Sequence, residues 1–453
     1  MTSVSDFSEQ KLERASFIRE VFSYIHRFKG QLFILKIEDS LMNHPLFPVL
    51  IRDIIHLHRA GIKVVIIPGT RKSIDDQLKV WNIDSSFHEG VRLTSEAALP
   101  LTELASLGVA QKIMSYLTAD GCRGIQGNWI SARSLGIIDG VDFMRTGRIE
   151  RIQKDILESL LAENFIPIIP PIGWNKLGHA YNISSTELAT ELCKYLQVGK
   201  LFFIGNEDGV HKDGLITGPK TQYLDSNESG IVSAIDIEQA EELLSLNAEH
   251  LNYAQKDYLA NAIRACKAGA NRVHLVNGET QGSILEEVFS GRGEGTMVYA
   301  NQYSCVRPAS IDDIPDILQI MQDYIKKGYL VPRTSESISK QLSDYVVYSI
   351  DNAIHGCGAL HCFEDGQTAE LAGVAVAANY RSSGVGDVIV RHLIATAKMR
   401  GFKSIFLLTT QALDWFYPFG FRDGSVEDLP QSKRESYNYK RNSRVLVLSL
   451  ENS

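Results

Sequence analysis

Short apolar runs alternate with segments of helical periodicity over the first two-thirds of the chain. The apolar runs lie at 31–37 (QLFILKI), 62–69 (IKVVIIPG) and 200–205 (KLFFIG), and two of them end in glycine. The segments 44–61 and 184–199 repeat apolar residues at the spacing of one helix face. Strands that are apolar throughout and bounded by glycine are typical of a parallel sheet covered on both faces. We therefore predict an α/β sandwich, with further elements at 165–173, 250–269 and 271–278.

A different order of elements begins near residue 300. Residues 304–325 predict a strand and then a helix that starts near Ser310, and 345–365 predict a β-hairpin that turns at Asp351 and Asn352. This order is typical of a mixed α+β domain with mainly antiparallel strands. Later strands are expected at 369–380, 404–410 and 443–450, and a short helix at 413–421.

The chain begins with a segment that belongs to neither pattern. Residues 8–28 have helical periodicity, with Phe17, Val21 and Tyr24 on one face. Because this helix precedes the first strand, it is an appendage to the α/β sandwich. The predicted organisation is an N-terminal helix within 1–28, a first domain over 29–298 and a second domain over 303–453.

Composition narrows the function classes. The 453 residues are 44% apolar and 22% charged, which is ordinary for a globular protein, and the net charge of -8 argues against binding to nucleic acid or anionic membranes. The six cysteines form no C-x-x-C pair or zinc pattern, so we expect reduced thiols and no metal. The polar N-terminus and the absence of a long apolar run lead us to expect a cytoplasmic protein.

The clearest chemical signal is the loop Arg381-Ser-Ser-Gly-Val-Gly386, which lies between an apolar strand and an amphipathic segment. A glycine-rich turn at a helix N-terminus exposes main-chain N–H groups that can hold a diphosphate. Glycine at 384 and 386 would leave a phosphate free to approach, and Arg381 could pair with it. An ordinary strand-to-helix turn would give the same pattern, and no G-K-[ST] follows that would make a Walker A loop.

This loop, the hairpin before it and the stretch Val306-Arg307-Pro308-Ala309 resemble, as an ordered set, the GNAT acetyltransferase family. The resemblance covers 304–450 and implies acetyl-CoA as co-substrate. It also implies that the strand from Glu370 to Ala377 parts from its neighbour and binds the pantetheine arm. The residues implied for CoA binding are Gly373, Val374, Val376, Arg381, Ser382, Ser383, Gly384, Val385, Gly386 and Asp387.

The upstream half resembles the amino-acid kinase fold, an open-sheet sandwich of the carbamate-kinase type. The similarity lies in the run IKVVIIPG and in the segment Asn182-Ile-Ser-Ser-Thr-Glu-Leu-Ala. The positions that hold ATP phosphates in such kinases are altered, because Glu38 and Asp39 follow Lys36 and would repel phosphate. We therefore expect a regulatory domain that does not bind ATP.

The two domains together resemble the N-acetylglutamate synthase family, with further similarity at 134–152, 267–278 and 429–447. The resemblance implies transfer of acetyl from acetyl-CoA to the amine of L-glutamate, in arginine biosynthesis. Glu370 matches the family's general base, and Thr409, more than its neighbour Thr410, matches the group that protonates the departing thiolate. The residues implied for the glutamate carboxylates are Val331, Arg333, Arg441 and Ser443.

Arginine-sensitive members of this family carry the N-terminal helix, so we expect inhibition by L-arginine and a homo-oligomer, with a hexamer as its size. Glu20 stands where the family often has histidine. Three alternatives stay open: an acylamino-acid kinase with a GNAT appendage, a non-catalytic arginine sensor, and a GNAT enzyme for another amine. The residues implied for arginine are Tyr24, Lys200, His274, Glu287, Gly293 and Gly295.

Overall fold

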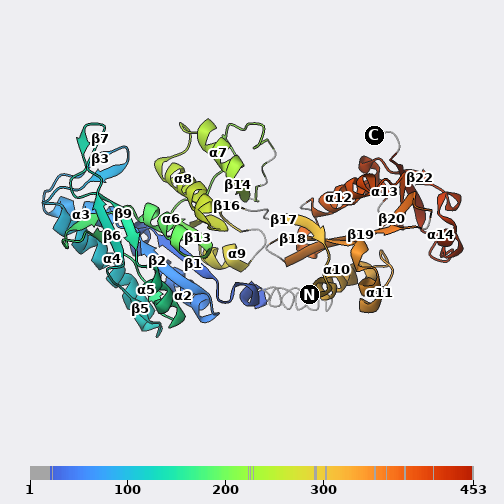
Figure 1. Ribbon diagram of the computed structural model, residues 1–453, viewed down its shortest axis with the longest axis horizontal. Coiled ribbons are helices and arrows are strands. Elements are labelled where there is room, and N and C mark those ends of the chain that lie inside the picture. The colour runs from blue at the N-terminus through green and yellow to red at the C-terminus, as the bar shows by residue number, and fades with distance from the viewer. Residues whose placement is uncertain are drawn as a thin grey trace, which may run out of the picture. The chain divides into compact units, whose positions relative to one another are not determined.

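The chain divides into two compact units, Met1–Asn301 and Gln302–Ser453 (Figure 1). The expected helix at residues 8–20, the hairpin turn at Asp351 and Asn352, and the loop residues Ser382 and Ser383 lie outside the described residues. The computed structural model describes residues 21–22, 24–222, 224, 226–227, 229–289, 293–300, 304–350, 353–363, 365–381, 384–411 and 413–450.

The first unit is built on a six-stranded sheet in the order β14-β16-β15-β13-β1-β2. Four neighbouring strands, β15, β13, β1 and β2, run parallel to one another, as the apolar runs predicted. The strands are β1 (Leu32–Ile37), β2 (Lys63–Pro68), β13 (Val198–Gly205), β14 (Ala234–Asp236), β15 (Arg272–Asn277) and β16 (Thr296–Tyr299).

The expectation of a wholly parallel sheet is wrong at one edge, where β16 runs antiparallel to β15. The helix between them, α9 (Ser283–Phe289), has seven residues and rises only about 10 Å. A six-residue strand such as β15 spans about 20 Å, so α9 cannot carry the chain back to the other end of the sheet. The next strand therefore starts near the end at which β15 finished.

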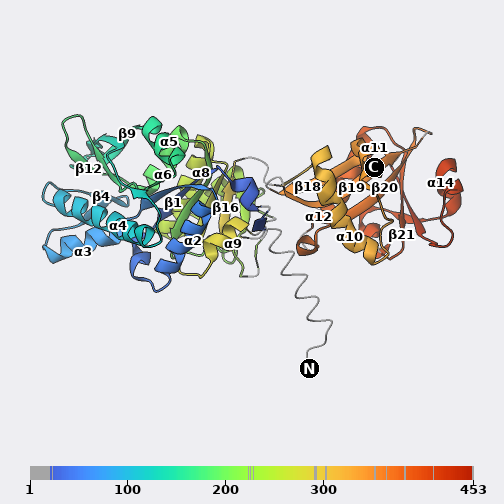
Figure 2. The ribbon, with the colours of Figure 1, turned by 90° about the horizontal axis from the view of Figure 1, so that it is seen from below.

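Helices cover both faces of this sheet (Figures 1 and 2). Successive side chains of β1 point to opposite sides, so Ile34 lies in one apolar cluster while Phe33 and Leu35 lie in the other. Tyr24 and Phe28, from the described end of the N-terminal helix, pack in the second cluster. Helices α6 (Ser185–Tyr195), α7 (Ile237–Leu246) and α8 (Tyr253–Ala268) cover the Ile34 side, and α2 (Phe47–Arg59), α4 (Leu99–Ala119) and α9 cover the other.

The apolar stretch 165–173 is not one strand. It forms two short strands in different sheets, because three prolines interrupt it and proline has no N–H to donate to a ladder. These are β10 (Ile166–Pro167), which pairs with β5 (Gly124–Ile125), and β11 (Ile172–Trp174), in a second sheet with β12 (Ala180–Asn182), β6 (Ile130–Ser134) and β9 (Gly147–Ile152). The unit is completed by α3 (Arg71–Val80), α5 (Lys154–Ala162) and the hairpins β3–β4 (Ser86–His88, Val91–Leu93) and β7–β8 (Ile137–Ile138, Val141–Asp142).

The second unit contains a seven-stranded sheet in the order β17-β18-β19-β20-β21-β23-β22. All neighbours are antiparallel except β20 and β21. Helix α12 (Val385–Met399) packs on one face, and α10 (Ile314–Lys326) and α11 (Ser335–Lys340) pack on the other. The strands are β17 (Ser304–Pro308), β18 (Tyr345–Ile350), β19 (Ala353–Cys362), β20 (Thr368–Val376), β21 (Ser404–Thr409), β22 (Arg422–Gly424) and β23 (Arg444–Ser449).

Neither unit offers a membrane span: among the described helices, none has both the length and the apolar character that crossing a bilayer needs. In the same ranges, His, Cys, Asp and Glu side chains form no group of three that could hold a metal ion.

Candidate active site

The parallel strands β20 and β21 separate partway along their length. They pair at three positions, the last of which joins Glu370 to Phe406, and the ladder gives no pairing with β21 for the described residues of β20 after Glu370. Gly373, at φ +63°, lies where β20 also shifts register against β19. Such a bulge bends the strand away from its neighbour. The main chain beyond Glu370 therefore borders a gap that an extended polar chain can enter as an added strand.

The main chain of this segment already has some partners. The Val376 N–H donates to the hydroxyl of Tyr324 (3.2 Å), and that hydroxyl donates to the Val376 carbonyl (3.0 Å). The Cys357 thiol lies 3.7 Å from the Gly373 carbonyl oxygen. A pantetheine arm that bonds to Val376 would have to replace the Tyr324 hydroxyl.

The loop after β20 has glycines for two different reasons. Gly384 precedes α12 at φ +76° and a Cβ there would meet nothing within 4 Å, so glycine is required by the left-handed backbone alone. A Cβ on Gly386 would lie 2.9 Å from Cζ2 of Trp415, so this glycine makes room for the indole of α13 (Leu413–Phe416). Arg381 lies against α10, 3.4 Å from the Asp323 carboxylate and over the Tyr324 ring.

The turn leads into the N-terminus of the 15-residue helix α12, where the sequence predicts a diphosphate. The open space at the Cβ position of Gly384 is compatible with that prediction, whereas the space at Gly386 is taken by Trp415. Asp387 lies in the first turn of α12, where its carboxylate suits the helix dipole but would repel a diphosphate. If Asp387 helps to bind CoA, it must do so through its main-chain N–H. The same holds for Val385, whose side chain is apolar.

Glu370, the expected general base, is buried and paired. Its two carboxylate oxygens accept hydrogen bonds from the Lys433 ammonium at 2.7 and 2.6 Å. Lys433 lies on the short helix α14 (Gln431–Glu435), which follows Leu429, a residue buried in one cluster with Phe406 of β21. The chain thus brings a cation to the base from a segment that lies far from it in the sequence.

Arg333, the expected contact of a substrate carboxylate, contacts two residues, and one of these is held by a third. Its Nη1 donates to the Tyr345 hydroxyl and to Nε2 of His361 (3.2 Å), and Nδ1 of His361 lies 2.8 Å from the Asp344 carboxylate. Arginine can only donate, so Nε2 must accept and the proton of a neutral His361 lies on Nδ1, directed at Asp344. His361 stands directly opposite Glu370 in the β19–β20 ladder, which puts Arg333 and Glu370 on one face of the sheet.

The other expected substrate residues come from two neighbouring segments. Nη2 of Arg441 donates to the carbonyls of Gly328 (3.1 Å) and Tyr329 (2.8 Å), just before the exposed Val331. Ser443 is buried, and its carbonyl accepts the Tyr437 hydroxyl at 2.5 Å. Arg441 therefore ties the C-terminal segment to the one that carries Val331 and Arg333.

Thr409 is the last residue of β21. Glu370 pairs with Phe406, so these two side chains point to the same face of the sheet. Because side chains alternate along β21, Thr410 lies on that face and Thr409 lies on the opposite one. Ile405 and Leu407 share the face of Thr409 and pack in the cluster that contains α12. A thioester in the gap between the strands can be approached from both faces, so a base and an acid on opposite faces are compatible.

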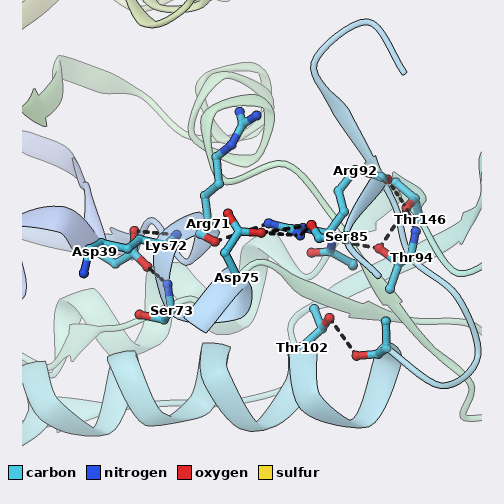
Figure 3. Close-up of polar contacts among 12 residues, drawn as sticks. Asp39, Arg71, Lys72, Ser73, Asp75, Ser85, Arg92, Thr94, Thr102 and Thr146 are labelled. Atoms are coloured by element: carbon cyan, nitrogen blue, oxygen red, sulfur yellow. Dashed lines mark hydrogen bonds and ion pairs between the residues drawn. The ribbon is translucent and has the colours of Figure 1, made fainter. Parts of the chain in front are cut away.

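In the first unit, the place where a kinase of this fold would hold phosphate is filled by side chains of the protein. The Lys36 ammonium pairs with Glu38, and a Cβ on Gly69 would lie 2.4 Å from Oε2 of Glu38. The Asp39 carboxylate accepts the main-chain N–H groups of Lys72 (3.3 Å) and Ser73 (2.5 Å) at the start of α3 (Figure 3).

The Glu38 carboxylate stays charged. Burial opposes ionisation of Glu38, but the charge and hydrogen bond of Lys36 outweigh it, so the net effect is a lowered pKa for the Glu38 carboxyl. Behind α3, the buried Arg92 is bonded to Asp75 (2.8 Å), which holds the helix against its surroundings (Figure 3). Two carboxylates thus occupy the glycine turn and the helix N-terminus where a nucleotide phosphate would bind.

Comparison with known proteins agrees with this division. Residues 31–277 match the amino acid kinase family, and residues 314–421 match the acetyltransferase (GNAT) family. An amino-acid acetyltransferase of Shigella flexneri is 30% identical over 453 residues, covering 98% of this chain and 99% of its own length. That of Pasteurella multocida is 31% identical over 449 residues, covering 97% of this chain and 98% of its own length. The chain belongs to the amino-acid acetyltransferase family.

Solved structures give the same result for this amino-acid acetyltransferase. N-acetylglutamate synthase from Neisseria gonorrhoeae, complexed with coenzyme A and L-arginine, is similar with a TM-score of 0.84 and 26% identity, over 97% of this chain and 99% of that one. A second structure of N-acetylglutamate synthase from the same organism, complexed with coenzyme A and N-acetyl-glutamate, has a TM-score of 0.60 over the same shares. The predicted enzyme class and the predicted order of domains are confirmed.

The residues expected to bind arginine do come together in the acetyltransferase's first unit. Glu287 accepts a hydrogen bond from Nδ1 of His274 (2.6 Å) and from the Gly295 N–H (3.1 Å). Nε2 of His274 is buried and has no hydrogen-bond partner among the residues that the structure describes. The Lys200 ammonium lies over the ring of Phe28, on which Tyr24 stacks. Gly293 lies close enough to Glu287 that a Cβ would come within 2.1 Å of Oε2.

Burial sets the charges in this cluster. It lowers the pKa of Lys200 to about 7, with help from Arg272, and it lowers the pKa of His274 to about 4, with help from Lys200. Burial would also raise the pKa of Glu287, but hydrogen bonds from His274 and Gly295 outweigh it, so the pKa is lowered. The cluster therefore presents one buried carboxylate beside a neutral histidine.

Four residues of the acetyltransferase site were missed by sequence reasoning: Lys433, His361, Asp344 and Tyr324. His361 carried a usable signal, because it lies on a strand of the hairpin next to the one that bears Glu370. Lys433 lies inside the stretch 429–447 that resembles the family, but no spacing links it to Glu370, since the contact is made through the tertiary fold. Asp344 and Tyr324 likewise gave no pattern of their own.

Proposed function

We propose that the protein is an N-acetylglutamate synthase that transfers the acetyl group of acetyl-CoA to the α-amine of L-glutamate. The observation that carries this proposal is the gap between β20 and β21, which starts beside the buried Glu370 and faces the Arg333 cluster. A thioester, a base and a cation for carboxylates can meet there. The similarity to N-acetylglutamate synthase from Neisseria gonorrhoeae supports the choice of glutamate.

In the proposed reaction, the N–H groups at the start of α12 and Arg381 bind the diphosphate of acetyl-CoA, and the pantetheine arm lies along β20. Glu370 takes a proton from the α-ammonium of glutamate, directly or through water, and the neutral amine attacks the thioester carbon. The tetrahedral intermediate collapses, the C–S bond breaks, and Thr409 donates a hydrogen bond or a proton to the departing thiolate. Arg333 and Arg441 bind the substrate carboxylates, with Val331 and Ser443 beside them.

We further propose that L-arginine binds at the Lys200–His274–Glu287 cluster and inhibits the enzyme. A guanidinium ligand needs a carboxylate that is charged without it, and Glu287 supplies one. The unpartnered Nε2 of the neutral His274 is an acceptor that a guanidinium N–H can reach. The Gly295 N–H already donates to Glu287, so the carboxylate of the ligand would be received by the main-chain N–H groups of Gly293 and Glu294.

The same unit supports a proposed homo-oligomer, for which we expect a hexamer. Leu104 and Leu107 on α4 are 59% and 46% exposed, although the opposite side of this helix packs into the core. Exposed apolar side chains that are close together on a helix are typical of a subunit contact. We place the enzyme in the cytoplasm, which suits the free thiols of Cys122, Cys193, Cys266, Cys357 and Cys362.

Thiol release from acetyl-CoA tests the proposal directly. We expect glutamate to give faster release than aspartate, glycine or lysine, and arginine to slow it. Glu370→Gln should lower kcat by about 10²–10⁴, the usual contribution of a positioned base, without weakening CoA binding. Glu435→Gln, a change of an exposed glutamate on α14, is the matched control and should leave the rate unchanged. Equal rates of thiol release with glycine and glutamate would exclude glutamate as the specific acceptor. Heat released on adding ATP in calorimetry would favour a kinase.

A further inference from the structure

The base proposed for the reaction has a partner of its own. Both oxygens of Glu370 receive the single ammonium of Lys433, and the side chains of the two residues are 10% and 25% exposed. An ion pair with so little solvent around it is screened less than a surface pair, so its geometry and charge affect the reaction more strongly. A base that is already bonded on both oxygens also cannot turn freely.

The position of Lys433 is set by the segment that carries it. Leu429, just before α14, is buried against Phe406 of β21, and Tyr437, just after it, donates its hydroxyl to the Ser443 carbonyl. Arg434 turns the other way and donates to the Leu429 carbonyl (3.3 Å). Both ends of the short helix are therefore fixed, and the fixed helix directs Lys433 at β20.

The other charged and titratable groups on this face do not contact the Glu370 carboxylate. His361, directly opposite on β19, accepts from Arg333 and faces Asp344, so its two nitrogens are engaged. Arg333 is bonded to the Tyr345 hydroxyl and to His361. Among the polar contacts of the described residues, those to the Glu370 carboxylate come from Lys433.

We propose that Lys433 is a positioning residue for the acetyl transfer: it holds the Glu370 carboxylate in the orientation from which it takes the proton of the acceptor ammonium. This inference rests on the proposed function of Glu370. Hydrogen bonds from one ammonium to both oxygens fix the rotation of the carboxylate, so the base is already oriented when the acceptor amine arrives.

The proton balance of this step is simple. One proton moves from the acceptor ammonium to the Glu370 carboxylate, and the freed lone pair forms the C–N bond as the C–S bond breaks. Lys433 fixes the orientation of Glu370 and takes no covalent part.

The separate effects on kcat and KM distinguish this role from a purely structural one. For Lys433→Met we expect kcat to fall by about ten-fold or more while KM for acetyl-CoA and for the amine stay near the wild-type values, since a misoriented base is felt in the transition state and not in substrate binding. Lys433→Arg keeps a cationic donor and should recover most of kcat. Lys440→Met, a change of an exposed lysine a few residues further on, should leave both quantities unchanged.

Each outcome decides the proposal. A kcat in Lys433→Met that equals that of the wild type overturns it, and so does a kcat in Lys433→Arg that is as low as that of Lys433→Met. A rise in KM for the amino acid alone would instead make Lys433 a substrate contact and also overturn it. The series is measured with whichever amine the wild type acetylates fastest, so an error in the choice of glutamate would show in the substrate panel and leave this test intact. Binding of CoA, measured by calorimetry, confirms that each variant is folded.

Discussion

Lys200 is a buried amine whose cost to the fold depends on pH. Its pKa is lowered from 10.5 to about 7, so between these values the unfolded chain holds a proton that the folded chain lacks. The free energy of unfolding therefore rises with pH across this window, and the buried lysine is most destabilising at about pH 7 and below. Replacement by methionine removes this dependence.

We predict that Lys200→Met raises the melting temperature near pH 7, by about 2–4 °C for each kcal/mol regained, and that the gain shrinks toward pH 10. Melting curves of both proteins without arginine, measured from pH 6.5 to 10, give the difference directly. Lys194→Met is the matched control, because Lys194 forms an exposed pair with Glu191. A gain that stays constant with pH would show that Lys200 titrates normally.

We expect His361 to act on the substrate through Arg333, whose Nη1 it holds. Removal of its Nε2 acceptor in His361→Ala leaves Arg333 with the Tyr345 hydroxyl and frees it to turn from the position that meets a carboxylate. The loss of one hydrogen bond to a charged group, about 1.5 kcal/mol, corresponds to a rise of about ten-fold in KM for glutamate. KM for acetyl-CoA should not change, nor should either constant in Cys362→Ala, the change of an exposed neighbour. Equal KM values for glutamate in His361→Ala and the wild type would contradict this role.

The sequence supplied the residues of this site that have a family pattern and missed those that act through them. Glu370 and Arg333 could be named because the motifs around them resemble those of GNAT enzymes and synthases. Lys433 and Asp344 reach their partners across 63 and 17 positions, and no periodicity encodes such a contact. The other limit is shown by Gly386. The sequence singled out this glycine, but it could not show that the indole of Trp415 packs against it.

At the scale of elements, the bulge in β20 is what opens the site. Gly373 has φ +63°, and a Cβ there would lie 2.9 Å from Cε of Met321 on α10. Gly366, in the turn before β20, has the same φ of +63° but open space around its Cβ position. Alanine substitutions at these two glycines therefore separate the loss of stability caused by a left-handed backbone from the loss caused by steric contact in the site.

We predict that Gly366→Ala lowers stability by about 1 kcal/mol, the ordinary penalty for a left-handed residue, and leaves CoA affinity intact. Gly373→Ala should lose more stability, because Met321 must move as well, and should bind CoA at least ten-fold more weakly as the bulge relaxes. Thermal unfolding and calorimetric titration with CoA measure the two effects. Equal losses in the two variants would mean that the bulge does not shape the CoA site.

The pattern of apolar and polar positions predicted most elements, and its errors have physical causes. The strands β1, β2 and β13 and the helices α2, α6 and α8 lie where it placed them, because their faces are buried and their ends are marked by glycine or capping residues. The expected parallel order fails at β16, a strand that the pattern did not predict, because strand direction depends on the length of the connecting helix. The split of 165–173 was missed because apolar character and proline compete in that stretch, and the prolines decided the outcome.

At the scale of the molecule, the first unit has kept a kinase-type sheet and filled its phosphate site with Glu38 and Asp39. A unit that no longer needs an open nucleotide site can serve as a sensor and as a surface for assembly. The arginine cluster lies next to the N-terminal helix through Tyr24 and Phe28, so a ligand there would bear on the same helix.

Assembly can therefore be tested apart from the chemistry. If Leu104 and Leu107 on α4 lie in a subunit contact, a charge at each would have to be desolvated there, and the double variant Leu104→Glu, Leu107→Glu should dissociate. We expect light scattering to give six times the 50.4 kDa mass of the chain for the wild type and a smaller multiple for the variant. Since the acetyl-transfer groups lie in the second unit, thiol release should persist in the variant while its response to arginine weakens. Ile156→Glu, at a similarly exposed position on α5, is the control for surface charge, and a variant mass equal to that of the wild type would remove α4 from the interface.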